Sequence, residues 1–376
     1  MSSQSGASNG RITAMIRSEG FRYKMLRKGV EYGEIFAASA GSARMNGRGE
    51  IKTSLQGSFF PYAVDSRGER TEINWISDEI KPYIVIDGTE HPIGVFLPAT
   101  VTPTTNRGQT TLNVEAYDRC WLVRDNKIED RIYFAAGTKY ITALETLLAS
   151  CGIASVAVTA TDSTLSTARD DWEPGTSYLS IINELLREIS YKELWFDANG
   201  TAIIEPESVP TAQNIRHRFT DKKPDPRNEK EVGIINAYPT VSKQTDIYQK
   251  PNVITCVCSS PDRSTDMSAT AENNNPESPL SVQRRGRRIV RFEKVNNIPS
   301  QEALEEYVKR RMMENMVTGE EISFPTPLRP GFGVNDVCSV SFANVTGVCI
   351  EREWEMQLTP GGQMTHKLER VVVNFG

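Results

Sequence analysis

The sequence has no long hydrophobic run, and no stretch approaches the roughly 20 apolar residues that a helix needs to cross a bilayer. The first twenty residues, MSSQSGASNGRITAMIRSEG, are polar and lack the apolar centre of a secretory signal. These absences argue against stable membrane insertion and lead us to expect synthesis in the cytoplasm. A particle assembled inside a cell can still leave it later.

Excess positive charge is also missing. The 376 residues carry a formal net charge of −5 and the isoelectric point is about 5.6, which argues against a general nucleic-acid binder. A hydrophobic content of 38% with 24% charged residues is typical of a folded globular chain. The length allows two or three domains.

Cysteine and histidine are scarce. Six cysteines in a chain of this length do not form a disulfide scaffold. Cys256 and Cys258 lie in VITCVCSS, where strand alternation places both on one face. A metal there would need two more ligands. No histidine has a suitable spacing from that pair (His91, His217 and His366). We therefore predict buried, reduced thiols and neither a metal site nor a cofactor site.

Sequence motifs of catalysis are missing as well. There is no GxxxxGK[ST] phosphate loop, no nucleophile elbow and no histidine in the context of a general base. The best candidates for chemistry are Asp170, Asp171 and Glu173, which flank Trp172. A glycosidase needs two carboxylates facing each other, one of them with a raised pKa. Adjacent acids usually point apart, and acids before a helix are electrostatically favourable, so we predict a structural role, no catalytic residues and no enzyme.

The strongest charge cluster is RRGRR, formed by Arg284, Arg285, Arg287 and Arg288. It could contact DNA or line a channel through which DNA passes. Binding through phosphates needs a broad basic surface, and this chain is acidic overall. A solvated loop, or salt bridges to an acidic neighbouring subunit, therefore fits the cluster better.

Residues 30–125 have a β pattern. Short segments rich in β-branched and aromatic residues are separated by Gly, Pro, Asn and Asp, as antiparallel hairpins require. Asp87-Gly88 is a tight-turn dipeptide between two of these segments.

Residues 128–208 predict a small α/β unit. In TKYITALETLLASCG the apolar residues recur at helical spacing. A second helix follows in 170–200, with Thr176 as its expected N-cap and an apolar stripe from Tyr178 to Ile189. ELWFDANGTAIIEP then predicts a hairpin that turns at Asn199-Gly200.

The rest of the chain returns to strands. Residues 206–231 are polar and proline-rich, as expected of a linker. PSQEALEEYVKRRMMENM predicts a third amphipathic helix with Ser300 as N-cap. VNDVCSVSF, GVCIEREWEMQL and KLERVVVNF predict the closing strands.

The first and last β regions share a layout. In the first region Asp78 precedes a strand and Gly94 opens a long strand, and in the last region Asp336 and Gly347 have the same places. A Gly-Gln turn then leads into a closing strand, at 108–109 or 362–363. This echo predicts a duplicated β-barrel. A trimer of such a chain would place six similar barrels in a ring and could match a six-fold partner.

The order of elements resembles the tail or baseplate hub family of long-tailed bacteriophages and related contractile injection systems. PIGVFLPATVTPTTNRGQTTLNVEAYDR is similar to the first barrel of that family. DWEPGTSYLSIINELLREISYKELWFDANGTAIIEP is similar to its small inserted domain. SPLSVQRRGRRIVRFEKVNNIPSQEALEEYVKRRMMEN, with PLRPGFGVNDVCSVSF, is similar to the second barrel with its helix.

The resemblance implies an α+β, mainly β fold with two tail-tube-like antiparallel β-barrels and a small inserted α/β domain. We divide the chain into an N-terminal extension (1–29), a first barrel (30–127), an insert with linker (128–230) and a second barrel (231–376) with a helix near 300–316.

The resemblance also implies a function. The chain would be a homotrimeric structural hub at the virion tail tip, assembled in the cytoplasm of the bacterial host. Its partners would be a tail tube or distal tail protein above, and a tip spike, tape-measure C-terminus or fibre-bearing protein below. DNA would at most pass through the lumen. The alternatives are a tail-associated peptidoglycan hydrolase and the hub of a bacterial contractile injection system.

Overall fold

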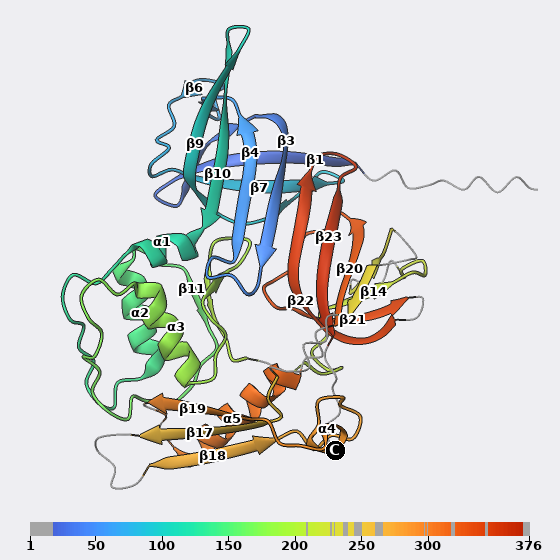
Figure 1. The fold of residues 1–376 in the computed structure, drawn as a ribbon. Helices are drawn as coiled ribbons and strands as arrows, with labels where there is room; N and C mark the ends of the chain where they lie inside the picture. The colour runs from blue at the N-terminus through green and yellow to red at the C-terminus, as the bar shows by residue number, and fades with distance from the viewer. Residues whose placement is uncertain are drawn as a thin grey trace, which may run out of the picture.

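The chain is mainly β in the computed structural model (Figure 1), with 23 strands and five helices among the residues described. The described residues are 18–207, 210–225, 228, 230–235, 240–243, 250–259, 266–296, 298, 300–316, 320–342 and 345–370. The predicted class, α+β with β dominant and a small α/β insert, is confirmed. Within these residues, no helix is long and apolar enough to span a membrane.

The first β half contains ten strands. These are β1 (Glu19–Arg27), β2 (Val30–Ile35), β3 (Ala37–Asn46), β4 (Thr53–Phe59), β5 (Ala63–Val64), β6 (Arg70–Thr71), β7 (Glu79–Ile86), β8 (Thr89–Pro92), β9 (Phe96–Asn106) and β10 (Gln109–Asp118). Three hairpins turn on two residues of positive φ, Lys28-Gly29, Asp87-Gly88 and Arg107-Gly108, as type I′ turns require. The predicted Asp87-Gly88 turn is confirmed. Strand β1 lies within residues 1–29, which we expected to be an extension.

The strands of this half curl around one core. Their hydrogen-bonded row runs β2-β1-β7-β9-β10-β4-β3, with every pair antiparallel. Its two ends, β2 and β3, are consecutive segments of the chain separated only by Phe36. No pairing joins these two described strands to each other, so the row is strongly curled but is not a closed barrel.

The second β half repeats part of this order. Its strands are β14 (His217–Thr220), β15 (Glu231–Gly233), β16 (Thr240–Lys243), β20 (Glu320–Pro327), β21 (Val337–Phe342), β22 (Val345–Leu358) and β23 (Gln363–Arg370). The row β16-β20-β23-β22-β21 is antiparallel throughout and matches β3-β4-β10-β9-β7 of the first half. The halves differ at the next strand, because β14 runs parallel to β21 whereas β1 runs antiparallel to β7.

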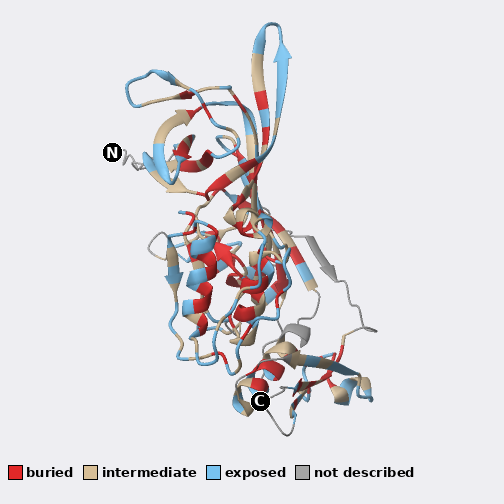
Figure 2. Cartoon of the chain, turned by 90° about the vertical axis from the view of Figure 1, so that its left-hand side faces the viewer, coloured by how far each residue is buried: buried red, intermediate tan, exposed pale blue. Residues whose placement is uncertain are grey.

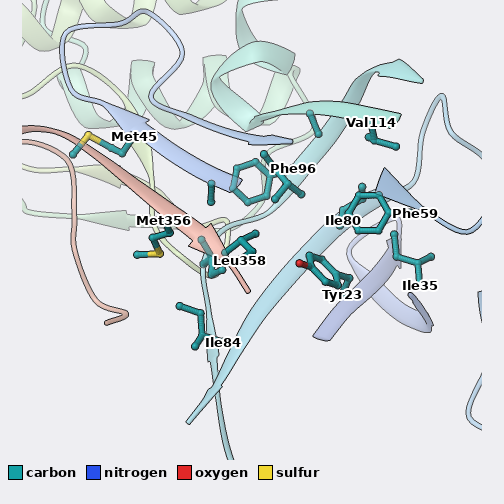
Figure 3. Packing of buried hydrophobic residues seen from close by; sticks show 14 of the residues in the cluster. Tyr23, Ile35, Met45, Phe59, Ile80, Ile84, Phe96, Val114, Met356 and Leu358 are labelled. Carbon is teal, nitrogen blue, oxygen red and sulfur yellow. The ribbon is translucent and has the colours of Figure 1, made fainter. Parts of the chain in front are cut away.

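The two halves form one continuous sheet. Strand β3 pairs with β22 from Asn46↔Glu353 to Gly41↔Leu358. Met356 and Leu358 of β22 therefore pack into the same core as Phe59 of the first half (Figure 3). The two predicted β-barrels are thus joined by backbone pairing across residues far apart in sequence. The described strands form no closed barrel.

The insert, residues 119–207, lies between the β halves in sequence and has its own core. Its elements are α1 (Arg119–Asp125), α2 (Tyr140–Ser150), β11 (Val156–Val158), α3 (Tyr178–Glu188), β12 (Trp195–Phe196) and β13 (Ala202–Ile204). Figure 2 shows the buried sides of its helices directed inward. The N-cap of α3 is Ser177, whose hydroxyl accepts from the N–H of Ser180, so the prediction of Thr176 was wrong by one residue. The hairpin β12–β13 is antiparallel as predicted, with Gly200 at φ 77°.

A further small unit, which we name the outer unit, comprises the described residues between 250 and 316. It contains β17 (Val253–Ser259), β18 (Met267–Glu272), α4 (Val282–Arg285), β19 (Val290–Asn296) and α5 (Gln301–Met316). Its sheet order is β18-β17-β19, with β19 parallel to β17. The Ser300 hydroxyl accepts from the Ala303 N–H, as expected of the predicted N-cap. The third helix thus packs on a separate sheet with a separate core rather than on the second β half.

Candidate assembly surface

The acidic stretch beside Trp172 is organised by a cation that the sequence analysis overlooked. Arg169 is 1% exposed and its guanidinium contacts Asp171 at 2.8 Å, Glu184 at 2.6 Å and Glu188 at 2.8 Å. It also lies 4.4 Å from the ring centre of Trp172. The indole of Trp172 donates to Glu184 at 3.1 Å and is buried within the insert.

The pKa values of this cluster reflect three carboxyl groups that share one buried cation. Burial raises the pKa of Glu188 to about 7, against the opposing effect of Arg169. Burial alone would raise the pKa of Asp171, but Arg169 brings it below its usual value. Asp170 is exposed, and Glu173 pairs with Arg131 at the surface. The carboxylates surround one guanidinium instead of facing each other across an open cleft, so the arrangement stabilises the insert and favours the structural interpretation.

A second polar cluster has the connectivity of a catalytic triad. In the second β half, Nε2 of His366 lies 2.8 Å from the hydroxyl of Thr326, and its Nδ1 contacts the carboxyl of Glu351. The three side chains come from β20, β22 and β23 and are all fully buried. Three phenylalanine rings surround the imidazole, those of Phe219, Phe324 and Phe332.

The hydrogen bond between Thr326 and His366 runs in the direction opposite to that of a catalytic triad, in which the hydroxyl donates to the imidazole. The Thr326 hydroxyl donates to the carbonyl of Pro327, so it accepts from the N–H of His366. Burial lowers the pKa of His366 to about 3 and raises the pKa of Glu351 well above its usual value. A neutral Glu351 therefore donates to Nδ1 of a neutral imidazole. A buried hydroxyl whose proton is already engaged cannot be activated by that histidine, so the cluster orders the core.

The basic run 284–288 is split by its local structure. Arg284 and Arg285 end the short helix α4, and Gly286 follows in the left-handed conformation. The side chain of Arg284 donates to the carbonyl of Pro276, and that of Arg285 donates to the carbonyl of Lys250. Arg288 pairs with Glu272 of the same chain. The run is therefore a short helix and turn rather than a loop, and only part of its charge is directed to solvent.

The cysteines and histidines are dispersed. All six thiols are free and buried. Cys256 and Cys258 lie on one face of β17, as their spacing predicted, and they share a core with residues of α5. Across the described ranges, no group of three His, Cys, Asp or Glu side chains has the arrangement of a metal site. His217 lies 3.4 Å from Asp336 and His91 lies on β8.

The two aspartates of the sequence echo occupy equivalent places in the two halves. Asp78 and Asp336 are buried and stand directly before β7 and β21. Asp78 accepts two bonds from Arg27, at 2.7 and 2.9 Å. Asp336 lies 3.1 Å from Arg216 and accepts from the backbone N–H of Gly333. Burial alone would raise the pKa of each carboxyl, but Arg27 holds the pKa of Asp78 below its usual value. His217, with Arg216 and Gly333, does the same for the pKa of Asp336.

The most prominent surface feature is the β9–β10 hairpin. Beyond the end of β4 it continues as a two-stranded ribbon that projects from the body with an exposed tip (Figures 1 and 2). At its base lies a shallow groove of about 550 Å³. Uncharged polar residues dominate its lining: Ser42, Gln56, Ser58, Thr100, Thr102 and Asn113. A smooth, weakly charged sheet face of this kind suits contact with a large partner better than retention of a small molecule.

Large apolar side chains are exposed at several places. Ile76 is 92% exposed at a cleft of about 1310 Å³ between the first β half and the insert. On the outer unit, Val290 and Phe292 are more than half exposed. Single exposed apolar residues are ordinary, whereas a contiguous group marks a contact surface.

Solved structures of tail proteins share this fold. A tail protein from Neisseria meningitidis MC58 superposes with a TM-score of 0.62 at 14% identity, covering 93% of this chain and 97% of that one. The 43 kDa tail protein of prophage MuSo2 from Shewanella oneidensis gives 0.62 at 11% identity, covering 94% and 98%. Prophage tail protein gp18 from Listeria monocytogenes EGD-e gives 0.50 at 11% identity, covering 92% and 94%.

The sequence comparisons gave no match, either to a protein-family model or to a curated protein. The shared fold extends over 92–94% of this chain. The resemblance seen in the sequence is thus confirmed at the level of the fold.

Proposed function

We propose that the chain is a structural hub subunit of a phage tail or phage-tail-like particle. Three copies would form a ring at the tip end of the tail. The observation that carries this proposal is the repeated strand order of the two β halves within one chain. Three chains with two similar β halves each supply six similar β halves, and closed cyclic symmetry then allows contact with a six-fold partner.

The partners follow from this position. A hexameric tail tube or distal tail protein would bind one side of the ring. A tip spike, the C-terminus of a tape-measure protein or a fibre-bearing protein would bind the other. The projecting β9–β10 hairpin and the polar groove at its base are the surfaces best suited to these contacts. The location is the virion tail tip, after assembly in the cytoplasm of the bacterial host, and DNA passes at most through the lumen of the ring.

The proposed role is mechanical rather than enzymatic. Arg169 pairs with the carboxylates beside Trp172. The side chains of Thr326, His366 and Glu351 are buried, and the Thr326 hydroxyl accepts a hydrogen bond from His366 instead of donating one to it. Neither cluster offers an accessible nucleophile, acid or base for hydrolysis of the cell wall.

Imaging of the assembled particle tests the proposal. Cryo-electron microscopy of the tail tip should show three copies of this chain around the axis, with both β halves in the ring. Light scattering on the purified ring should give three times the 41.9 kDa of one chain. A ring with another copy number, or release of peptidoglycan fragments by the purified chain, would refute it.

A further inference from the structure

The sheet of the outer unit has a helix on one of its faces. Helix α5 packs against β17 and β18, and its buried residues include Leu304 and Val308. In Figure 1 the helix lies behind the three strands. Of the described elements, α5 is the only one that makes extensive contact with this sheet from another layer.

The opposite face carries exposed apolar side chains. On β19, Glu293 points toward α5, where it pairs with Arg311 at 3.0 Å. Because side chains alternate along a strand, Val290 and Phe292 point away from α5, and they are 56% and 57% exposed. Phe292 stands beside Thr255 of β17 in the register of the sheet.

The rest of this face is flat and weakly polar. The hydroxyl of Thr255 lies 3.0 Å from that of Thr270 on β18. Val257 continues the row along β17 and is partly buried. Three neighbouring strands thus present one patch, in which Phe292 of the edge strand β19 is the largest exposed apolar side chain, and such a group can mark a contact surface.

The two sides of the outer unit differ in charge. Residues 284–294, which lead into and form β19, contain six Arg or Lys and one Glu. Four of these cations bind groups of the same chain: Arg284, Arg285, Arg288 and Arg291. Arg287 and Lys294 are exposed. Residues 301–309, at the start of α5, contain three Glu and one Lys. The exposed side chains of Lys294, Glu305 and Glu306 make no ion pair with any described residue. Unpaired charges of opposite sign therefore lie on opposite sides of one small unit.

We propose that the open sheet face around Phe292 binds the acidic outer side of α5 on a second copy of this chain. The contact is heterologous, because one copy uses its sheet face and its neighbour uses its helix. Repetition of such a contact closes a ring when the rotation between neighbours permits it. It would bury the apolar patch and bring Lys294 toward Glu305 and Glu306. This inference rests on the proposed function, and it assigns the outer unit a place in ring closure.

Substitutions on the two sides test the contact in the full-length chain. Phe292→Asp places a charge within the patch, and loss of a buried aromatic anchor typically costs about tenfold or more in affinity. We expect sedimentation over a concentration series to show a trimer dissociation constant raised at least about tenfold. Tyr133→Asp is the matched control, since Tyr133 is 65% exposed on the insert, and it should leave the constant unchanged.

Charge exchange separates a specific contact from a folding defect. Arg287→Glu with Lys294→Glu makes the basic side acidic, and Glu305→Lys with Glu306→Lys makes the acidic side basic. Each pair alone should weaken the trimer, and the four changes together should restore most of its stability. Absence of restoration, or a trimer indifferent to Phe292→Asp, overturns this contact and leaves the hub proposal standing. A wild-type chain that is monomeric at every concentration also overturns it, whereas the hub proposal is judged separately by the copy number in the particle.

Discussion

Arg169 should be essential to the stability of the insert. We expect Arg169→Met, which keeps an unbranched stem but removes the charge, to lower the free energy of unfolding by about 3–5 kcal/mol, the usual cost of removing one partner of a buried ion pair. This loss applies when unfolding is measured well above pH 7, where Glu188 is ionised. The reason is Glu188, which is 9% exposed and lies 2.8 Å from the guanidinium. Without the cation it must either keep a buried charge or bind a proton.

The magnitude comes mainly from that one pair. Charges a few ångströms apart attract by about 4 kcal/mol at an effective dielectric constant near 20. The two outer carboxylates, Glu184 and Asp171, are 41% and 55% exposed, so each adds no more than about 1 kcal/mol. Loss of the contact with Trp172 adds a cation–π term of similar size.

Urea unfolding followed at Trp172 provides the assay. The chain has several cores, so a single global transition is not expected. Fluorine NMR of 5-fluorotryptophan protein reports the insert separately, with Trp172→Phe to assign the resonance. Arg131→Met is the matched control, because Arg131 pairs with Glu173 at 2.6 Å with both side chains more than half exposed, and it should cost at most about 1 kcal/mol. Equal losses in the two variants would refute the reasoning.

Three other measurements probe separate features. The pKa of Glu188 is about 7 in the folded chain and about 4.5 in the unfolded one. Between these two pH values the folded chain binds one proton more than the unfolded chain. The free energy of unfolding should therefore fall by up to about 3 kcal/mol as the pH rises through this window. Glu188→Gln should flatten this slope in urea titrations, and an unchanged slope contradicts the assignment. Gly200→Ala should lower the free energy of unfolding by more than Gly137→Ala, for which we expect about 1 kcal/mol. Both glycines have positive φ, but only at Gly200 would the added Cβ lie 2.8 Å from the side chain of Val95. Nitrogen NMR of His366 should show a neutral ring protonated at Nε2 and unchanged from pH 5 to 8, since its pKa is about 3; a titration in that range would show that the site is open to water.

Many local features were predictable because they depend on neighbouring residues. Turns such as Asp87-Gly88 need residues that tolerate positive φ. The helix at 178–188 follows from the spacing of its apolar residues. We predicted Thr176 as its N-cap, whereas the N-cap is Ser177. Both residues carry a hydroxyl that can cap a helix, and only the backbone geometry of the folded chain selects one of them.

The candidate sites were less predictable because their members are distant in sequence. The carboxylates around Trp172 were visible, but the significance of Arg169 was not, since only folding of α3 against this segment brings Glu184 and Glu188 to it. No motif signalled that His366 would meet Thr326, 40 positions away, between two strands.

The sequence by itself determined the type and order of many elements, the small insert and the echo between the β regions. It did not predict β1 and β14, which lie in segments that we expected to be an extension and a linker. Periodicity, caps and turns are short-range properties, and they survive without knowledge of the fold. Only the tertiary structure decided that β3 pairs with β22 and fuses the halves into one sheet, and that Asp78 and Asp336 are buried beside their arginines. It also separated the third helix from the second β half and left the face around Phe292 uncovered. These outcomes depend on which buried surfaces and backbone groups find partners across hundreds of residues, and local sequence does not specify that choice.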